Sequence, residues 1–281
     1  MRKIKVSKLR EVVSALCLKA NFELRKDVLC ALKSSVKREA DARARSMLRA
    51  IIENAAIART RKMAICQDTG MAVVHMDIGQ DVVFTGGSLK EAVDKGVEDA
   101  YKKGYFRKSV VDDPRLRRNT GTNTPAILYT DIVDGDRVRI SVSSKGFGSE
   151  NKSMVKMFNP TASTEEIKRF VLSVVREAGP DACPPLVLGI GMGGTFEKAA
   201  LLAKKALLRP IHRKNPKRHI AKLETELLKD INSLGIGPMG LGGRTTALGV
   251  NILENPTHIA GLPVAVNVSC HVTRSAEAVI L

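Results

Sequence analysis

The stretch from residue 183 to residue 208 restricts the fold more than any other part of the sequence. It reads CPPLVLGIGMGGTFEKAALLAKKALL. A short apolar run, a group of glycines and a helical spacing of apolar residues predict a strand, a glycine loop and a helix in that order. A strand followed by a helix that covers it indicates a protein in which helices pack on a sheet.

The glycines of this stretch satisfy a dinucleotide-binding pattern. Gly189, Gly191 and Gly194 form G-x-G-x-x-G after a predicted strand and before a predicted helix. NAD binding also needs an acidic residue about 20 residues further on, where Arg209 stands. A basic residue suits a 2′-phosphate, so NADP binding is an alternative that depends on this loop alone. The other interpretation is a tight turn whose amide groups face an anion or a cluster.

Periodicity and capping signals place the other elements. Ser88 with Glu91, and Ser163 with Glu166, are capping-box pairs that predict helices ending at Gly104 and at Gly179-Pro180. Asp134-Gly135 joins two β-rich runs, which predicts a hairpin over residues 126–144. Further predicted elements are three helices within residues 1–62, a strand after Gly70, a final helix after the glycine-rich residues 235–246, and a strand over 262–270.

The predicted fold class is α+β. We expect a single mixed domain over residues 1–281, in which a β-sheet core carries helices and the helical, basic segment 1–62 is integrated with it. The 281 residues, 44% of them hydrophobic, are ample for a packed core.

The net charge of +17 is the strongest compositional anomaly. Residues 1–62 carry 17 Lys and Arg against 6 Asp and Glu, and residues 197–222 carry 9 against 1. Such a density of positive charge indicates an anionic partner, namely nucleic acid, an acidic subunit or a small anionic substrate. The alternative is that the basic residues form solvated helix faces. The absence of Trp and only 4% aromatic residues argue against base-stacking nucleic-acid binders. No apolar run is long enough to span a membrane and no secretory signal is recognisable, so we expect a cytoplasmic protein without a membrane partner.

Five cysteines spread over a chain of this size favour reduced thiols or metal ligands over disulfides. Cys17 and Cys30 lie in predicted helices, where they are small core or boundary residues. Cys66, Cys183 and Cys270 each end or interrupt an ordered segment beside turn-forming or polar residues. They lie too far apart for a zinc knuckle, so the residues alone leave structural cysteines, a metal or cluster site, and a catalytic thiol open.

A set of longer motifs gives these cysteines a context. In chain order they are CQDTG, NTGTNTPA, KGFGSENKS, GPDACPPLVLGIGMGGTFEKA, GPMGLGGRTTALGV and LPVAVNVSCHVTR. From about residue 40 to its C-terminus the chain resembles the class I, iron–sulfur fumarate hydratase and L-tartrate dehydratase family, in its α subunit or N-terminal half. The resemblance implies that Cys66, Cys183 and Cys270 bind a 4Fe-4S cluster. Three thiolates leave one iron without a protein ligand, and that iron can act as a Lewis acid on a substrate.

The resemblance also implies which residues do the chemistry. Gln67 and Asp68 face the substrate, and Asp68 is an acid or base for the hydroxyl group; the alternative for Asp68 is an Asx turn. His258 matches a family histidine near the active site that orients or protonates Asp68, although a lone histidine is more often structural.

Further site residues are implied on two other segments. Arg107 matches an arginine that grips a substrate carboxylate with its guanidinium fork, or is a surface arginine. Gly146 and Gly148 bring backbone amides near the substrate, or are turn glycines. Arg244, His271 and Arg274 lie in matching motifs, and the sequence gives them no role.

The function implied by the resemblance is reversible hydration of fumarate to L-malate, with L-tartrate dehydration as the alternative. The family's single-chain members continue into a second domain with the carbon base, and this chain ends at Leu281. We therefore expect a separate β subunit, a hetero-oligomer and a small dicarboxylate substrate. A basic nucleic-acid-binding protein is the alternative from another class; no helix-turn-helix or RNA-binding motif favours it.

Overall fold

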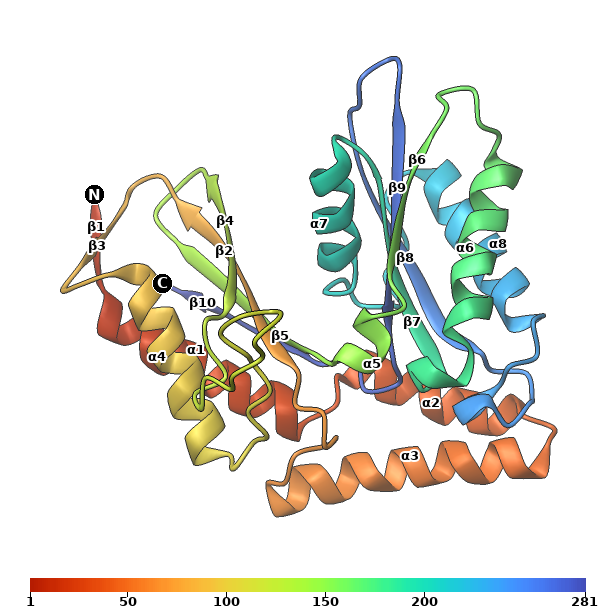
Figure 1. Ribbon diagram of the computed structural model, residues 1–281, viewed down its shortest axis with the longest axis horizontal. Helices are drawn as coiled ribbons and strands as arrows, with labels where there is room; N and C mark the ends of the chain where they lie inside the picture. The colour runs from red at the N-terminus through yellow and green to blue at the C-terminus, as the bar shows by residue number, and fades with distance from the viewer. The chain divides into compact units, whose positions relative to one another are not determined.

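The computed structural model describes residues 1–281, and the chain divides into two compact units (Figure 1). Unit 1 comprises Met1–Arg25, Asn54–Phe147 and Arg274–Leu281, and unit 2 comprises Lys26–Glu53 and Gly148–Thr273. Each unit combines helices with its own mixed sheet, which confirms the predicted α+β class.

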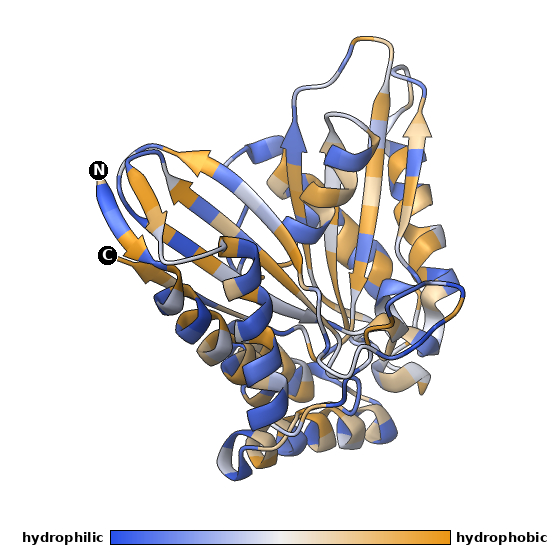
Figure 2. Ribbon diagram, turned by 60° about the vertical axis from the view of Figure 1, so that its left-hand side comes forward, coloured by the Kyte–Doolittle hydropathy of each residue, from blue (hydrophilic) through white to orange (hydrophobic).

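A four-stranded sheet in the order β10-β5-β2-β4 is the centre of unit 1. Its strands are β2 Met71–Gly79, β4 Ile127–Val133, β5 Val138–Lys145 and β10 Ser275–Ile280. Helices α1 Val6–Phe22 and α4 Leu89–Lys103 pack against each other, and α1 lies on β5 and β10. Apolar residues of these helices and strands form one buried cluster, part of which is orange in Figure 2. A short parallel pair, β1 Arg2–Lys5 with β3 Val82–Thr85, completes the unit.

The predicted hairpin over residues 126–144 is wrong. Strands β4 and β5 are consecutive in the chain, but β2 lies between them, parallel to β4 and antiparallel to β5. Residues 72–76 of β2 are all buried. A strand that is buried on both faces belongs in the interior of a sheet, and this preference prevails over the local turn signal.

Unit 2 is a three-layer arrangement around a second sheet, in the order β6-β9-β7-β8. Its strands are β6 Met154–Phe158, β7 Leu186–Gly193, β8 Ala247–Asn255 and β9 Leu262–Ser269. Helix α7 Phe196–Ala206 covers one face, while α6 Thr164–Ala178 and α8 Arg218–Asn232 cover the other (Figure 1). The core of the unit lies mainly between the sheet and the latter pair.

Further helices lie outside this three-layer arrangement. Helix α2 is Lys26–Arg38, and α3 Ala42–Arg61 begins in unit 2 and ends in unit 1. With α1 they confirm the three helices predicted within residues 1–62. The short helices are α5 Phe147–Glu150, η1 Gly179–Ala182 and η2 Pro238–Gly240.

The capping signals predicted two helix boundaries correctly. The Ser88 side chain accepts the backbone N–H of Glu91 at the start of α4, which ends at Gly104. At α6, Ser163 and Glu166 form a complete capping box, and Gly179 follows the last helical residue. The final helix predicted after residue 246 is instead strand β8. Short apolar runs such as ALGVNIL fit a buried strand as well as a helix, and β8 pairs with β7 along its length.

The predicted glycine loop is largely part of a strand. Gly189 and Gly191 lie inside β7, and only Gly193 and Gly194, with φ of 84° and 70°, form the turn into α7. A Cβ atom on Gly189 would lie 2.1 Å from the Ala203 carbonyl oxygen, and one on Gly191 would lie 2.0 Å from that of Ala199. These glycines therefore let α7 lie directly on the β7 backbone, and they form no phosphate-binding loop.

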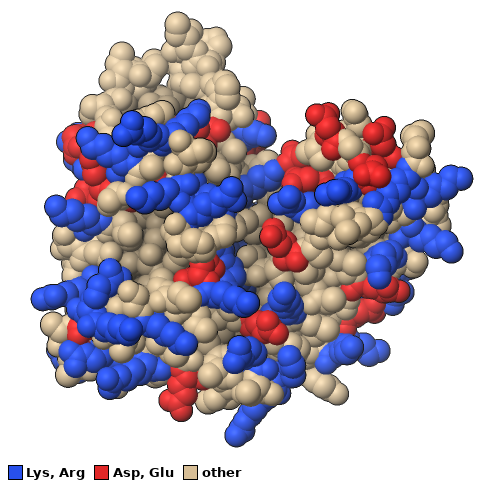
Figure 3. Space-filling model, turned by 180° about the vertical axis from the view of Figure 1, so that it is seen from behind, with Lys and Arg blue, Asp and Glu red and all other residues tan.

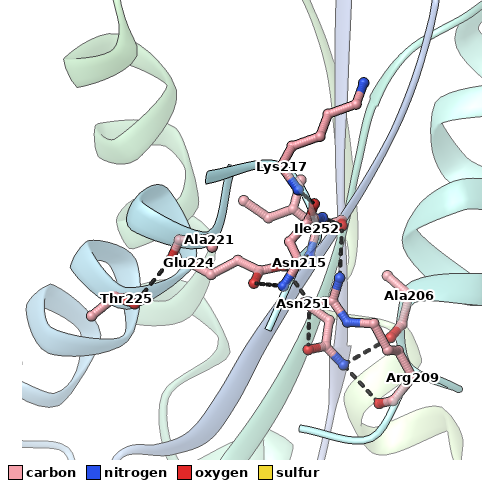
Figure 4. A network of polar contacts seen from close by, with 9 residues as sticks. All are labelled: Ala206, Arg209, Asn215, Lys217, Ala221, Glu224, Thr225, Asn251 and Ile252. Atoms are coloured by element: carbon pink, nitrogen blue, oxygen red, sulfur yellow. Dashed lines mark hydrogen bonds and ion pairs between the residues drawn. The ribbon is translucent and has the colours of Figure 1, made fainter. Parts of the chain in front are cut away.

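Arg209 is likewise engaged within the fold (Figure 4). Its guanidinium group forms an ion pair with Glu224 and donates to Asn251 Oδ1 at 2.9 Å and to the Ile252 carbonyl oxygen at 3.3 Å. The Glu224 carboxylate also accepts the Ile252 N–H at 2.7 Å. These contacts connect the α7–α8 segment to β8. They engage the Arg209 guanidinium group that the NADP alternative would need for a 2′-phosphate.

The two remaining cysteines differ in burial. Cys17 is fully buried in α1, where burial raises the pKa of its thiol to about 12, so it is the inert core residue that was predicted. Cys30 is exposed on α2 and is not a core residue.

The basic residues do not gather in one patch on the face shown in Figure 3. Lysine and arginine side chains are spread across it with acidic side chains among them. In the basic segment 197–222, for example, Lys217 forms an ion pair with Glu254. None of the helices is long and apolar enough to span a membrane.

We expect Gly191→Ala to lower the free energy of unfolding by about 1–3 kcal/mol, because the added methyl group forces α7 away from β7. Gly261→Ala is the matched control, since an added Cβ there meets nothing within 4 Å. Urea denaturation of both variants measures the difference. Equal stability of the two would show that α7 does not lie directly on β7.

Candidate active site

Asp68 lies in a tight turn of unit 1 that connects the end of α3 to β2. Its Oδ1 accepts the Gly70 N–H at 2.9 Å, which is the Asx turn considered as the alternative role of Asp68. Its Oδ2 accepts the N–H of Phe147, just beyond the end of β5, at 2.8 Å. Both oxygens of this partly buried carboxylate are therefore fixed in direction by backbone donors.

Gly70 allows this arrangement. Its φ is +70°, and a Cβ atom there would lie 2.6 Å from the carbonyl carbon of Lys145. A side chain would thus be strained by the left-handed backbone and would also collide with the end of β5. Glycine at this position lets the turn approach β5 closely enough for Asp68 to reach Phe147.

Two buried side chains hold the backbone after Asp68. The Tyr101 hydroxyl donates to the carbonyl oxygens of Thr69 at 2.7 Å and Gly70 at 3.0 Å, and Asn123 Nδ2 donates to the latter at 3.1 Å. Burial raises the pKa of Tyr101, so its hydroxyl stays a donor. No motif indicated either role, because hydrogen bonds to backbone carbonyl oxygens leave no pattern in a sequence.

Arg107 is connected to this turn through its backbone. The Thr69 hydroxyl donates to the Arg107 carbonyl oxygen at 2.7 Å, while the Arg107 side chain is exposed. Gln67 is exposed on the other side of Asp68, and its Oε1 accepts the Cys66 thiol at 3.4 Å. Within unit 1, Gln67 thus directly precedes Asp68, Thr69 links this turn to the Arg107 backbone, and a Cβ atom on Gly146 would lie 3.0 Å from Asp68 Oδ2.

Cys183 and Cys270 lie at the same end of the sheet in unit 2. Cys183 shortly precedes β7, Cys270 directly follows β9, and these strands are antiparallel neighbours with Val187 opposite Ser269. His271 joins the two loops, since its backbone N–H donates to the Cys183 carbonyl oxygen at 3.3 Å and its Nδ1 lies 2.9 Å from that oxygen. This contact gives His271 a structural role that the sequence did not show.

Gly148 lies near the same end of unit 2. A Cβ atom on Gly148 would lie 3.6 Å from the carbonyl oxygen of Asp181, in the η1 turn that leads to Cys183. The segment after Gly148 is anchored by Glu150, which pairs with Lys204 and accepts Asn267 Nδ2 at 2.8 Å. These two partners are further residues that sequence patterns missed.

His258 lies at the other end of β9. It is exposed in the turn between β8 and β9, and its Nδ1 accepts the Ala260 N–H at 3.2 Å. The eight residues of β9 separate this turn from Cys270, and eight extended residues span roughly 26 Å. Unit 2 therefore does not bring His258 close to its two cysteines, and the role of His258 toward Asp68 stays a prediction. Arg244 is also exposed, and its backbone N–H donates to Glu39.

A sequence model of the fumarate hydratase (fumerase) family matches residues 10–279. The chain belongs to this family. The putative L(+)-tartrate dehydratase subunit alpha of Methanocaldococcus jannaschii is 41% identical over 274 residues, which cover 96% of each chain. The L(+)-tartrate dehydratase subunit alpha of Escherichia coli strain K12 is 30% identical over 268 residues, which cover 94% of this chain and 88% of the relative.

The three cysteines of this fumarate hydratase family member offer donors that fit an iron–sulfur cluster. Cys66, Cys183 and Cys270 form no disulfide bond and are only partly buried, and thiolates are the usual ligands of such clusters. Cys66 belongs to unit 1 and the other two to unit 2. No group of three or more His, Cys, Asp or Glu side chains is arranged to hold a metal ion, so the convergence of the three sulfur atoms stays a prediction.

Tyr101→Phe is expected to lower the free energy of unfolding by about 1–3 kcal/mol, because the Thr69 carbonyl oxygen loses a buried donor while the ring still fills its space. Tyr105→Phe is the matched control, since Tyr105 is 95% exposed, and we expect a change below about 0.5 kcal/mol. Urea denaturation of the purified chain distinguishes the two. If Tyr101→Phe were as stable as the control, the hydroxyl group would not hold the turn.

Proposed function

We propose that this chain is the α subunit of a hydro-lyase that adds water to, or removes it from, a four-carbon dicarboxylate. Membership of the fumarate hydratase family and relatives named as dehydratase α subunits support this proposal. The observation that carries it is the Asp68 turn. There both oxygens of the Asp68 carboxylate accept backbone N–H groups. The next residue, Thr69, donates a hydrogen bond to the backbone of Arg107.

Cys66, Cys183 and Cys270 would hold a 4Fe-4S cluster in this proposal. When bound, the cluster supplies an iron without a protein ligand, which is a Lewis acid for a substrate oxygen. Partial exposure of the three thiols supports the assignment, as does the location of two of them at one end of a sheet. A cytoplasmic location is part of the proposal, since a reducing compartment keeps these thiols reduced.

Asp68 exchanges the proton of the substrate hydroxyl. A carboxylate has about four lone-pair sites, and the N–H groups of Gly70 and Phe147 occupy only two of them. The other sites remain for a substrate or a water molecule, and the fixed carboxylate needs no rearrangement before proton transfer.

Arg107 and the neighbouring polar groups bind the substrate. The exposed Arg107 guanidinium group can grip a carboxylate through two parallel hydrogen bonds. Gln67 supplies a side-chain amide next to Asp68, and Gly146 and Gly148 supply backbone amides. His258 remains in the proposal as a prediction from family resemblance.

Two substrates are candidates. Hydration of fumarate to L-malate is supported by the family name, and dehydration of L-tartrate is supported by the names of the relatives. Both reactions need an electrophile at the oxygen and a base at the carbon. We propose that the carbon base comes from a separate β subunit, because these relatives are named as α subunits.

In the complete enzyme, Asp68→Asn is expected to lower kcat by ~10²- to 10⁴-fold, because an amide cannot carry the proton. The amide can also accept only one of the two backbone N–H groups, which costs about 1–3 kcal/mol of stability. Steady-state kinetics and urea denaturation separate the two effects. Asp112→Asn, at an exposed carboxylate, is the control. An unchanged kcat in Asp68→Asn would remove Asp68 from the reaction.

The chain purified without oxygen is expected to bind about four iron atoms and to be inactive alone. Activity with malate or L-tartrate is expected only after a β subunit is added, because incomplete sets of catalytic groups lose the benefit of positioning. Iron analysis measures the first property. The ultraviolet absorbance of the conjugated double bond that dehydration of malate creates measures the second. Full activity of the chain alone would exclude the β-subunit requirement, and an iron-free chain that is active with a β subunit would exclude the cluster.

A further inference from the structure

Arg274 is a buried cation whose hydrogen bonds all go to neutral oxygens. It is 4% exposed and directly precedes β10. Its guanidinium group donates to the Ser144 carbonyl oxygen at 3.2 Å, to Asn21 Oδ1 at 3.3 Å and to the Asp68 carbonyl oxygen at 2.7 Å. The shortest of these contacts is with the residue that we propose to transfer the proton.

The Asp68 carboxylate lies on the same side of Gly146 as Arg274. A Cβ atom added to Gly146 would lie 3.0 Å from Asp68 Oδ2 and 3.5 Å from Arg274 Nη2. The carboxylate and the guanidinium group therefore border the same small space, which only a glycine leaves open. Opposite charges so placed in a protein interior attract more strongly than they would in water.

A buried charge without compensation costs several kcal/mol. Three carbonyl oxygens satisfy part of the guanidinium group, which has five N–H donors. The nearby Asp68 carboxylate supplies the negative charge that these neutral partners lack. The backbone of Asp68 thus accepts a hydrogen bond from Arg274, and its carboxylate lies on the same side of Gly146 as the guanidinium group.

We propose that Arg274 is the positioning residue for Asp68. It holds the backbone of Asp68, and its charge keeps the carboxylate directed along Gly146 toward the Phe147 N–H. This role rests on the proposed function of Asp68, but it is a property of unit 1 alone.

The alternative is that Arg274 only stabilises the fold. Arg274 connects α1, β5 and the Asp68 turn, so its loss would lower stability in either case. Two measurements respond to positioning and not to stability as such. They are the hydrogen exchange of the two amides that bind the carboxylate, at Gly70 and Phe147, and the separate effects on kcat and KM.

The test compares Arg274→Gln and Arg274→Lys with Arg209→Lys. Arg209 is the matched control, because it is a largely buried arginine of unit 2 that binds a carboxylate and a carbonyl oxygen, and Asp68 is not among its partners. Hydrogen exchange is measured on the α chain, and kinetics on the complex with its β subunit, with malate and with L-tartrate.

In Arg274→Gln, exchange at Gly70 and Phe147 is expected to rise by more than ~10-fold over the control, and kcat to fall by about 10²-fold, the effect of misplacing a catalytic group by about 1 Å. KM is expected to stay within about twofold, since Arg107 is untouched. Arg274→Lys is expected to restore part of kcat, because it keeps the charge and loses the fork. Wild-type exchange and kcat in folded Arg274 variants would overturn the proposal.

Asn21→Asp keeps the test decisive if the Arg274 variants fail to fold. It retains Arg274 and gives the guanidinium group a carboxylate of its own, so we expect kcat to fall by about tenfold because less charge acts on Asp68. A folded Asn21→Asp variant with wild-type kcat would overturn the proposal. If the wild-type complex itself is inactive, the proposed function fails, while the exchange measurement still decides whether Arg274 positions Asp68.

Discussion

The close approach of Gly70 to the end of β5 is the constraint on which the candidate site depends. Without a side chain at this position, the turn after α3 reaches the Lys145–Phe147 segment, and the Asp68 carboxylate can accept the N–H of Phe147. Tyr101, Asn123 and Thr69 then hold a turn that already has its shape. The site in unit 1 is thus built mainly from backbone groups, with a few buried side chains that fix them.

Local signals in the sequence predicted elements well where a single interaction decides the structure. Ser88 and Ser163 cap helices because their hydroxyl groups accept backbone N–H groups three residues later. Asp68 was correctly considered as an Asx turn for the same reason. The hairpin at Asp134-Gly135 was wrong because strand pairing depends on how completely β2 is buried, which a turn signal does not contain.

The candidate site was predicted in part, and for a different reason. Its residues were found through long motifs that resemble a family. Unit 1 places Gly146 beside Asp68 and links the Asp68 turn to the Arg107 backbone. Arg274 and Tyr101 could not be given roles from the sequence, because their partners are backbone carbonyl oxygens from distant segments. Gly189 and Gly191 were misplaced in a loop because a pattern of glycines does not distinguish contact with a phosphate from contact with a helix backbone.

The order of segments along the chain has a consequence for synthesis on the ribosome. The last segment of unit 1, Arg274–Leu281, contains Arg274 and strand β10. In the chain, Gly148–Thr273 of unit 2 lies between this segment and β5. At ~5–20 residues per second, translation of that intervening segment takes on the order of ten seconds. For that interval β5 lacks the neighbour that later covers its edge, and edges of this kind pair readily with other chains. The Asp68 turn likewise lacks the hydrogen bond from Arg274 during this interval. A nascent chain that stalls in this segment therefore exposes the part of unit 1 that contains the candidate site.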